Sequence, residues 1–213
     1  MKKLLSLVLA AAFITMAFTA CGGPEITADA SCEVLYNLYI KQDVTNTDKL
    51  GISADESKEI LDLMNKTAAD TFITNATGNG TNGLTVTDEQ AAQVAQAIYI
   101  AQKKLTPKFE LVSSDKKTAV VKITTNYIEQ TTIDTDAATQ AVEAVNALGL
   151  TDENEWAKKV VEEYISRLVD GLNNAQPSAE TREMTVEMSV TDGVWLPTNM
   201  ETFATNLSSS VAA

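Results

Sequence analysis

The sequence contains no histidine among its 213 residues. Histidine is the side chain used most often as a general base near neutral pH and as a metal ligand. Its absence argues against serine and cysteine catalytic triads and against zinc enzymes. The sequence also has no phosphate-binding loop, no G-x-S-x-G nucleophile motif and no dinucleotide fingerprint. It therefore lacks the signatures of several common enzyme classes.

Basic residues are also scarce. The chain has 16 Lys and Arg residues against 29 Asp and Glu residues, which gives a formal net charge of −13 at pH 7. A protein this acidic is not drawn to nucleic acid or to an anionic membrane surface by electrostatics. The charge favours solubility, and binding of a cationic partner is a further possibility.

The N-terminus carries the one long apolar run in the sequence. Lys2 and Lys3 precede residues 4–18, which are apolar except for Ser6 and Thr15. A charged start followed by a short apolar stretch and small residues is typical of a secretory signal peptide. The run is too short for a comfortable membrane span, which needs ~20 apolar residues.

The end of this run has a second feature. Phe18-Thr19-Ala20-Cys21 resembles the lipobox of bacterial lipoproteins, in which the Cys sulfur receives a diacylglyceryl group and becomes the mature N-terminus. The family usually has Leu or a similar aliphatic residue where Phe18 stands. The resemblance implies that Cys21 is the lipid-attachment residue and that the protein is held at the outer face of a bacterial cell membrane. Two acyl chains are enough for stable anchoring. Ordinary cleavage after Ala17 or Ala20, giving a secreted protein, is the alternative.

The predicted organisation has three parts: a lipoprotein signal peptide at 1–20, a flexible tether at 21–27 and a single domain at 28–213. Removing the signal peptide takes away two Lys and no acid, so the net charge changes from −13 to −15. The remaining chain of about 190 residues is long enough to bury a proper core.

Cys32 is the only cysteine left once Cys21 is acylated. Neither an intramolecular disulfide nor a Cys-based metal site is therefore predicted. Cys32 shares a helical face with Leu35, Tyr36 and Tyr39, and we interpret it as a small buried apolar residue. A reactive thiol is the alternative.

The spacing of apolar side chains predicts helices at 28–42, 53–72, 87–105, 135–148, 151–172 and 198–207. Capping boxes are predicted at Ser53–Glu56, Thr87–Gln90 and Thr198–Glu201, and Thr151 is predicted to cap the helix after it. The stripe predicted to face the core in the fourth helix comprises Ala138, Val142, Val145 and Leu148. The segment 74–83, almost entirely Thr, Asn and Gly, is predicted to be a mobile loop.

Alternating patterns predict two hairpins, one of 108–112 with 118–129 and one of 183–190 with 194–196, the second turning at Asp192-Gly193. Neither face of 118–129 is strongly polar, so we expect both faces to be partly covered. Strands joined by hairpins are antiparallel, and helices clustered away from them indicate an α+β fold. We predict an antiparallel sheet of about four strands packed against several helices.

Several features together resemble a group of small Gram-positive lipoproteins of unknown function. They are the lipobox with its Gly-Gly, the helix beginning Ala28-Asp29-Ala30, the Lys-rich central strands, the Asp192-Gly193-Val194-Trp195 hairpin, and the closing helix with Phe203 and Leu207. Such domains are similar to cystatin or to the cone-shaped fold of nuclear transport factor 2 and ketosteroid isomerase. The resemblance implies a curved sheet wrapped around helices and a pocket, and it carries over no catalytic residue.

The acidic residues are the remaining candidates for chemistry, because carboxylates with Tyr can perform acid–base catalysis without His. Asp134 and Asp136, and the group Asp152, Glu153 and Glu155, stand near predicted helix N-termini. Capping explains both groups, and their spacing is not that of a calcium loop. We predict no metal and no cofactor. The residues most able to line a pocket, with core packing as the alternative, are Tyr99, Tyr127, Tyr164, Trp156 and Trp195.

The function that these observations favour is that of a lipid-anchored, non-catalytic binding or scaffold module of the bacterial envelope. Its expected partners are the membrane, through the N-terminal lipid, and an envelope protein or a small molecule. The alternative is a cone-fold pocket enzyme, an isomerase or hydrolase that uses a buried carboxylate and a Tyr. A two-lobed solute receptor is disfavoured because the chain is short for that class.

Overall fold

The computed structural model describes residues 24–78 and 85–213. The predicted signal peptide and Cys21 lie outside the described residues, as do residues 79–84 of the predicted loop. The elements in chain order are α1 (Ala28–Lys41), the short 3-10 helix η1 (Thr47–Leu50), α2 (Ala54–Gly78), α3 (Asp88–Gln102), β1 (Lys108–Ser114), β2 (Thr118–Asn126), α4 (Gln130–Asn146), α5 (Glu153–Asn174), β3 (Thr181–Thr191), β4 (Val194–Pro197) and α6 (Met200–Val211).

The four strands form one open antiparallel sheet in the order β1-β2-β3-β4. β2 pairs with β3 over its whole length, from Thr118 opposite Ser189 to Asn126 opposite Thr181, although α4 and α5 separate the two strands in sequence. The predicted Asp192-Gly193 turn joins β3 to β4 with positive φ at both residues, 49° and 80°, the sign that a type I′ turn requires. The predicted α+β class with a sheet packed against helices is confirmed.

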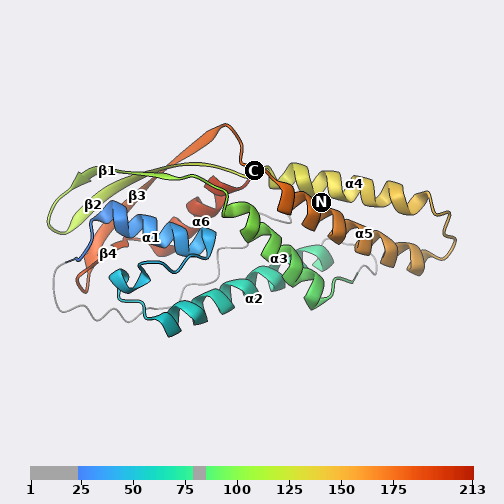
Figure 1. Cartoon of the computed structure of the whole chain (residues 1–213), viewed down its shortest axis with the longest axis horizontal. Helices are drawn as coiled ribbons and strands as arrows, with labels where there is room; N and C mark the ends of the chain where they lie inside the picture. The colour runs from blue at the N-terminus through green and yellow to red at the C-terminus, as the bar shows by residue number, and fades with distance from the viewer. Residues whose placement is uncertain (1–23, 79–84) are drawn as a thin grey trace.

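Helices α1 and α6 pack against one face of the sheet (Figure 1). Tyr36 of α1 forms a hydrogen bond of 2.9 Å with Thr125 of β2. Arg182 of β3 donates to the carbonyl oxygens of Ser209 and Ala212 near the end of α6, both at 2.7 Å. The main core cluster lies between this sheet face and the helices that cover it.

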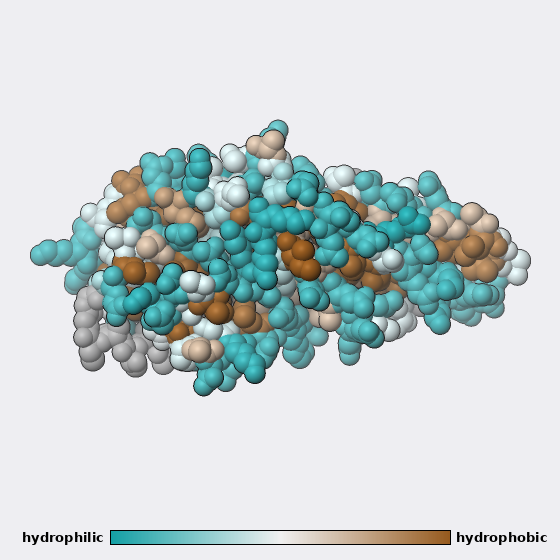
Figure 2. Space-filling view, viewed as in Figure 1, coloured by the Kyte–Doolittle hydropathy of each residue, from teal (hydrophilic) through white to brown (hydrophobic). Residues whose placement is uncertain are grey.

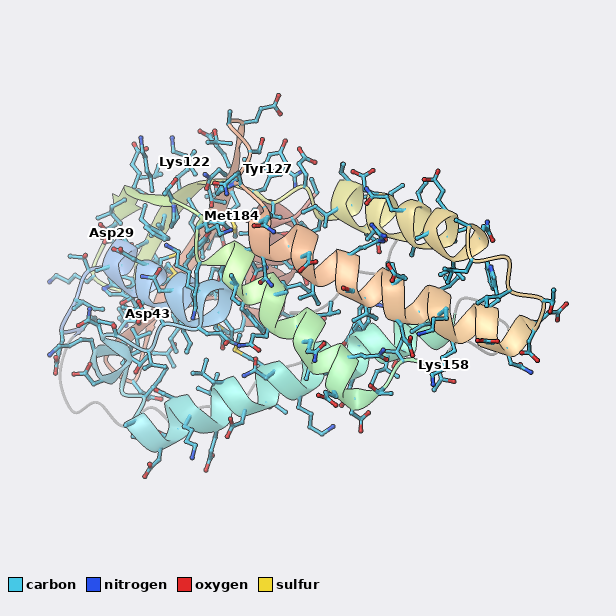
Figure 3. All side chains as sticks on the ribbon, turned by 45° about the vertical axis from the view of Figure 1, so that its right-hand side comes forward. Asp29, Asp43, Lys122, Tyr127, Lys158 and Met184 are labelled. Atoms are coloured by element: carbon cyan, nitrogen blue, oxygen red, sulfur yellow. The ribbon has the colours of Figure 1, made fainter. Side chains whose placement is uncertain are left out.

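The opposite face of the sheet carries polar side chains of intermediate exposure. Lys122 of β2, labelled in Figure 3, pairs across the strands with Glu110 at 3.0 Å and with Glu183 at 3.9 Å. The long stem of a lysine shields the strand beneath it while its ammonium stays in water. The side chains that form these cross-strand ion pairs thus partly cover this face of the sheet, as expected.

Helices α2 to α5 pack against one another, and α4 and α5 form a long hairpin that extends away from the sheet (Figure 1). Their apolar side chains form a second core cluster, to which Phe72, Ile98, Leu168 and Leu172 belong. These four helices therefore share a second apolar core beside the sheet core.

Two predicted capping boxes are confirmed. At the start of α2 the Glu56 N–H donates to Ser53 Oγ at 3.2 Å, and the Ser53 N–H donates back to Glu56 Oε2 at 2.8 Å. Thr87 and Gln90 make the same reciprocal pair at the start of α3. Each box satisfies two backbone N–H groups that have no partner within the helix.

The predicted caps of the last two helices are wrong by one residue. The side chain of Asp152, not Thr151, accepts the hydrogen bond that caps α5. Asn199, not Thr198, caps α6, because the Thr198 hydroxyl donates to a carbonyl oxygen of β3 instead. Asp and Asn are at least as good as Thr at this position.

Part of the predicted loop 74–83 is helical, because α2 continues to Gly78. The Thr74 hydroxyl donates to the carbonyl oxygen of Asp70 at 2.8 Å, which is a bond within the helix. Ile73 and Ala76 pack against the second core cluster. Burial of these two residues overrides the weak helix propensity of the Thr and Asn residues around them.

Helix α4 begins at Gln130, five residues before its predicted start. The Thr131 N–H donates to the carbonyl oxygen of Ala213 at 2.7 Å, so the far end of the chain satisfies a donor of the first turn. The face that is buried also differs from the predicted stripe: it comprises Gln130, Asp134, Ala137, Ala141 and Val145. Leu148, predicted to be in the core, is 61% exposed.

Candidate functional site

The described chain begins three residues after Cys21, and its first residues contact the domain. Ile26 packs against the main core cluster. Glu25 accepts a hydrogen bond from Lys49 Nζ at 3.1 Å, which joins the start of the described chain to η1. The described part of the predicted tether, residues 24–27, is thus in contact with α1 and η1.

Cys32 lies on the buried face of α1, in the main core cluster. Its side chain is fully buried, and burial raises the pKa of the thiol to about 12. A thiol with such a high pKa has almost no thiolate at neutral pH, and the thiolate is the reactive form. The interpretation of Cys32 as a small buried apolar residue is confirmed.

A buried carboxylate lies between the two helices of the α4–α5 hairpin. Asp134, 5% exposed, accepts a hydrogen bond of 2.5 Å from the hydroxyl of Tyr164. Burial raises the pKa of Asp134, and the hydrogen bond from Tyr164 opposes this rise. Burial and the neighbouring carboxylate together raise the pKa of Tyr164 as well.

The prediction that Asp134 serves as an N-terminal cap is therefore wrong. The residue stands in the second turn of α4, on the buried face, and its partner comes from α5. Asp136 is exposed but lies in the second turn of α4, so it is not at the N-terminus either. Asp152 caps α5, and Glu153 and Glu155 lie in its first turn, as expected. Periodicity could not reveal the pair, because an aspartate does not count as a core residue in an apolar stripe.

The two members of this pair predict opposite effects on stability. Tyr164→Phe should lower the free energy of unfolding at pH 7 by about 1–3 kcal/mol, because it leaves a buried carboxylate without its donor. Asp134→Asn keeps an acceptor for Tyr164 and removes the buried charge, so it should raise the free energy of unfolding at pH 7. Urea unfolding of the wild type and both variants would measure the difference.

The same pair predicts a pH dependence. The ordinary pKa of an aspartate, which applies to the unfolded protein, is 3.8, and the pKa of Asp134 in the folded protein is higher. Above pH 3.8 the folded state therefore binds more protons than the unfolded state does. The stability of the wild type relative to Asp134→Asn should be highest below pH 3.8, where the carboxyl group is protonated in both states. It should fall as the pH rises to the folded-state pKa. A difference that stays constant from pH 4 to pH 8 would contradict this account.

A hollow of about 340 Å³ lies beside η1 and the first turns of α2. Its lining consists of Val44, Thr47, Asp48, Ile52, Ala54, Ser57, Lys58 and Leu61. The Thr47 hydroxyl donates its hydrogen to the carbonyl oxygen of Val44. In the hydrogen bond of 3.0 Å between Thr47 and Ser57, the Ser57 hydroxyl is therefore the donor and Thr47 Oγ1 the acceptor. With these hydroxyls satisfied, Asp48 and Lys58 are the charged groups left to contact a guest. Asp134 and Tyr164 are not part of this lining.

The five aromatic residues proposed as pocket liners do not line this hollow either. Tyr99 and Trp195 are buried in the main core. The Tyr127 hydroxyl donates to Glu180, and the Arg182 guanidinium lies 4.0 Å from the centre of its ring. Tyr164 pairs with Asp134, and Trp156 is half-buried on α5. Core and intramolecular contacts account for them.

Two further features bear on function. Within residues 24–78 and 85–213, no group of three or more Cys, Asp or Glu side chains is placed to hold a metal ion. In the same part of the chain, no helix has the length and apolar character needed to span a membrane.

The fold is similar to that of a solved protein. No protein-family model matches the chain, and no curated protein was found to be similar to it. The similar structure is that of ycdA from Bacillus subtilis, which carries the name "putative lipoprotein". The TM-score is 0.66 at 12% sequence identity, and the match covers 87% of this chain and 56% of ycdA. This chain thus spans about half the length of ycdA, and at this identity the likeness shows the fold alone.

Proposed function

We propose that this protein is a bacterial lipoprotein, anchored through Cys21 at the outer face of the cell membrane, which acts as a non-catalytic binding or scaffold module of the envelope. The observation that carries the proposal is the sequence Phe18-Thr19-Ala20-Cys21 after a charged and apolar start. The first described residue of the folded domain, Pro24, follows it within three positions. The name carried by the similar structure, a lipoprotein, agrees with the proposal.

The binding role is supported by the arrangement of the polar groups. The buried carboxylate of Asp134 and the Tyr164 hydroxyl satisfy each other. The hollow beside η1 is lined by other residues. A pocket enzyme remains the second candidate, because Asp134 and Tyr164 are the residue types that it requires. A cone-shaped domain like that of nuclear transport factor 2 stays a prediction.

Substitution of Cys21 tests the anchor. Wild-type protein expressed in a bacterium should sediment with membranes and carry an acylated N-terminal Cys by mass spectrometry. Cys21→Ser should lose this membrane fraction almost completely, by release or by failure of processing, because no acyl acceptor remains. Two acyl chains provide stable anchoring that no other described feature replaces.

The second cysteine offers a matched control. Cys32→Ala removes a thiol that lies in the core, so it should leave the membrane fraction unchanged. Unchanged sedimentation of Cys21→Ser would contradict the proposal. Recovery of the wild type in the medium, cleaved after Ala17 or Ala20, would indicate an ordinary secreted protein instead.

A further inference from the structure

The anchored end and the α4–α5 hairpin lie at opposite ends of the long axis. Asp29 at the start of α1 and Lys158 on α5 are far apart in Figure 3, and Figure 1 shows the same separation of the two helices. Pro24 follows Cys21 by three positions, and three residues of chain span at most ~11 Å. Helix α5, with 22 residues, is ~33 Å long. With the proposed anchor in place, the tip of the hairpin is the part of the domain that can extend far from the membrane.

This tip exposes apolar side chains. Leu148 is 61% exposed, Leu150 two positions further on is half-buried, and so is Trp156 in the first turn of α5. Figure 2 shows apolar surface gathered at the end of the molecule where the hairpin tip lies. The Trp156 indole N–H donates to Asn146 Oδ1 at 2.9 Å, which holds the ring against the end of α4. Tryptophan is enriched among the residues that dominate binding energy at interfaces.

The surroundings of the apolar tip are acidic. Glu143, Asp152, Glu153 and Glu155 are all exposed, and the sequence has no Lys or Arg from 130 to 157. None of the ion pairs among the described residues involves these four acids. Like charges would oppose a second copy of this tip or an anionic surface, whereas basic groups on a partner would be attracted.

We propose that the tip of the α4–α5 hairpin, formed by Leu148, Leu150 and Trp156, is a docking surface for a basic amphipathic segment of another polypeptide. Apolar side chains of the segment cover the three tip residues, and its Lys or Arg side chains face the surrounding acids. The reach of the tip away from the membrane rests on the proposed lipid anchor, whereas the binding itself does not.

The probe for this surface is a synthetic helical peptide of Leu and Lys, without Trp. It is titrated against the full lipidated protein on phosphatidylcholine vesicles. The emission of Trp156 reports binding, because Trp195, the other tryptophan, is only 7% exposed. We expect a saturable blue shift. Leu148→Glu should weaken binding about tenfold or more.

This substitution separates apolar docking from general attraction. Leu148→Glu adds a negative charge, so a purely electrostatic complex would become tighter rather than weaker. The matched control is Leu63→Glu on α2, which replaces another exposed Leu, 39% exposed, and should bind as the wild type does. Both sites are exposed, so the two variants should melt close to the wild type.

The outcomes that overturn the proposal are equal losses in both variants, equal binding of an all-Lys peptide, or binding of a Leu–Glu peptide. Self-association of the protein through the tip in sedimentation velocity would also overturn it. Sedimentation with the vesicles in the absence of peptide tests the anchor separately. Loss of that sedimentation with an intact Trp156 response contradicts the anchor and leaves the docking surface standing.

Discussion

Tyr36→Ala should lower the free energy of unfolding by about 3–5 kcal/mol, which is the range for removal of a buried aromatic ring. Tyr36 is fully buried, and its ring meets Phe109 edge-on with 5.6 Å between the centroids. It joins α1 to both β1 and β2. Because a domain has only about 5–15 kcal/mol of stability, this single change should remove a large fraction of it. Equilibrium unfolding in urea would measure the loss.

Tyr36→Phe is the matched comparison. Thr125 Oγ1 donates its one hydrogen to the carbonyl oxygen of Asn126 at 2.9 Å, so the Tyr36 hydroxyl must be the donor to Thr125. The Phe variant loses this one hydrogen bond and keeps the ring, which should reduce stability by about 0.5–1.5 kcal/mol. If the Phe and Ala variants lost the same amount, packing of the ring would not be the source of the effect.

Gly171→Leu should reduce stability by about 3 kcal/mol, the upper part of the usual range for overpacking. Gly171 of α5 faces Ile133 of α4. A Cβ added at this position would lie 2.7 Å from Cγ2 of Ile133. That contact is too short for two carbon atoms, and Ile133 is branched at Cβ, so its methyl group has little freedom to move away. The α4–α5 hairpin would have to separate to accept any side chain at 171.

Smaller changes at the same contact provide the control. Gly171→Ala gains about 1 kcal/mol of helix propensity but still places a Cβ against Ile133, so we expect a net loss of stability. Combining it with Ile133→Ala removes the clashing methyl group. The double variant should then lose less than the sum of the two single variants, by about 0.5–3 kcal/mol. Strict additivity in urea unfolding would contradict a direct contact between the two positions.

Several features governed by neighbours within four residues were predictable from the sequence, although the caps of α5 and α6 were placed one residue early. The boxes Ser53–Glu56 and Thr87–Gln90 form because each donor and acceptor is only three positions apart. The Asp192-Gly193 turn follows in the same way from the backbone angles that these two residues tolerate. Such local signals, with the periods of the helices and strands, were enough to predict the α+β class.

The errors in the bounds of α2 and α4 occurred where distant residues compete with local preference. Residues 74–78 are helical because Ile73 and Ala76 pack on the second core cluster, although their neighbours favour a loop. The start of α4 was placed late because its first turn is polar and is completed by the carbonyl oxygen of Ala213. Neither partner is close in sequence, so no window of the sequence reveals it.

The candidate site likewise has features that depend on residue order and features that depend on contacts between distant residues. The sequence by itself determined the acidity of the protein, the absence of histidine chemistry and the predicted lipid attachment at Cys21, because these depend only on residue identity and order. Only the tertiary structure decided that Asp134 is buried beside Tyr164 while Leu148 is exposed. A one-residue rotation of the α4 stripe exchanges buried and exposed positions, and that rotation depends on which side chains of α5 lie opposite. A hydroxyl thirty residues away in sequence makes an aspartate acceptable in the core.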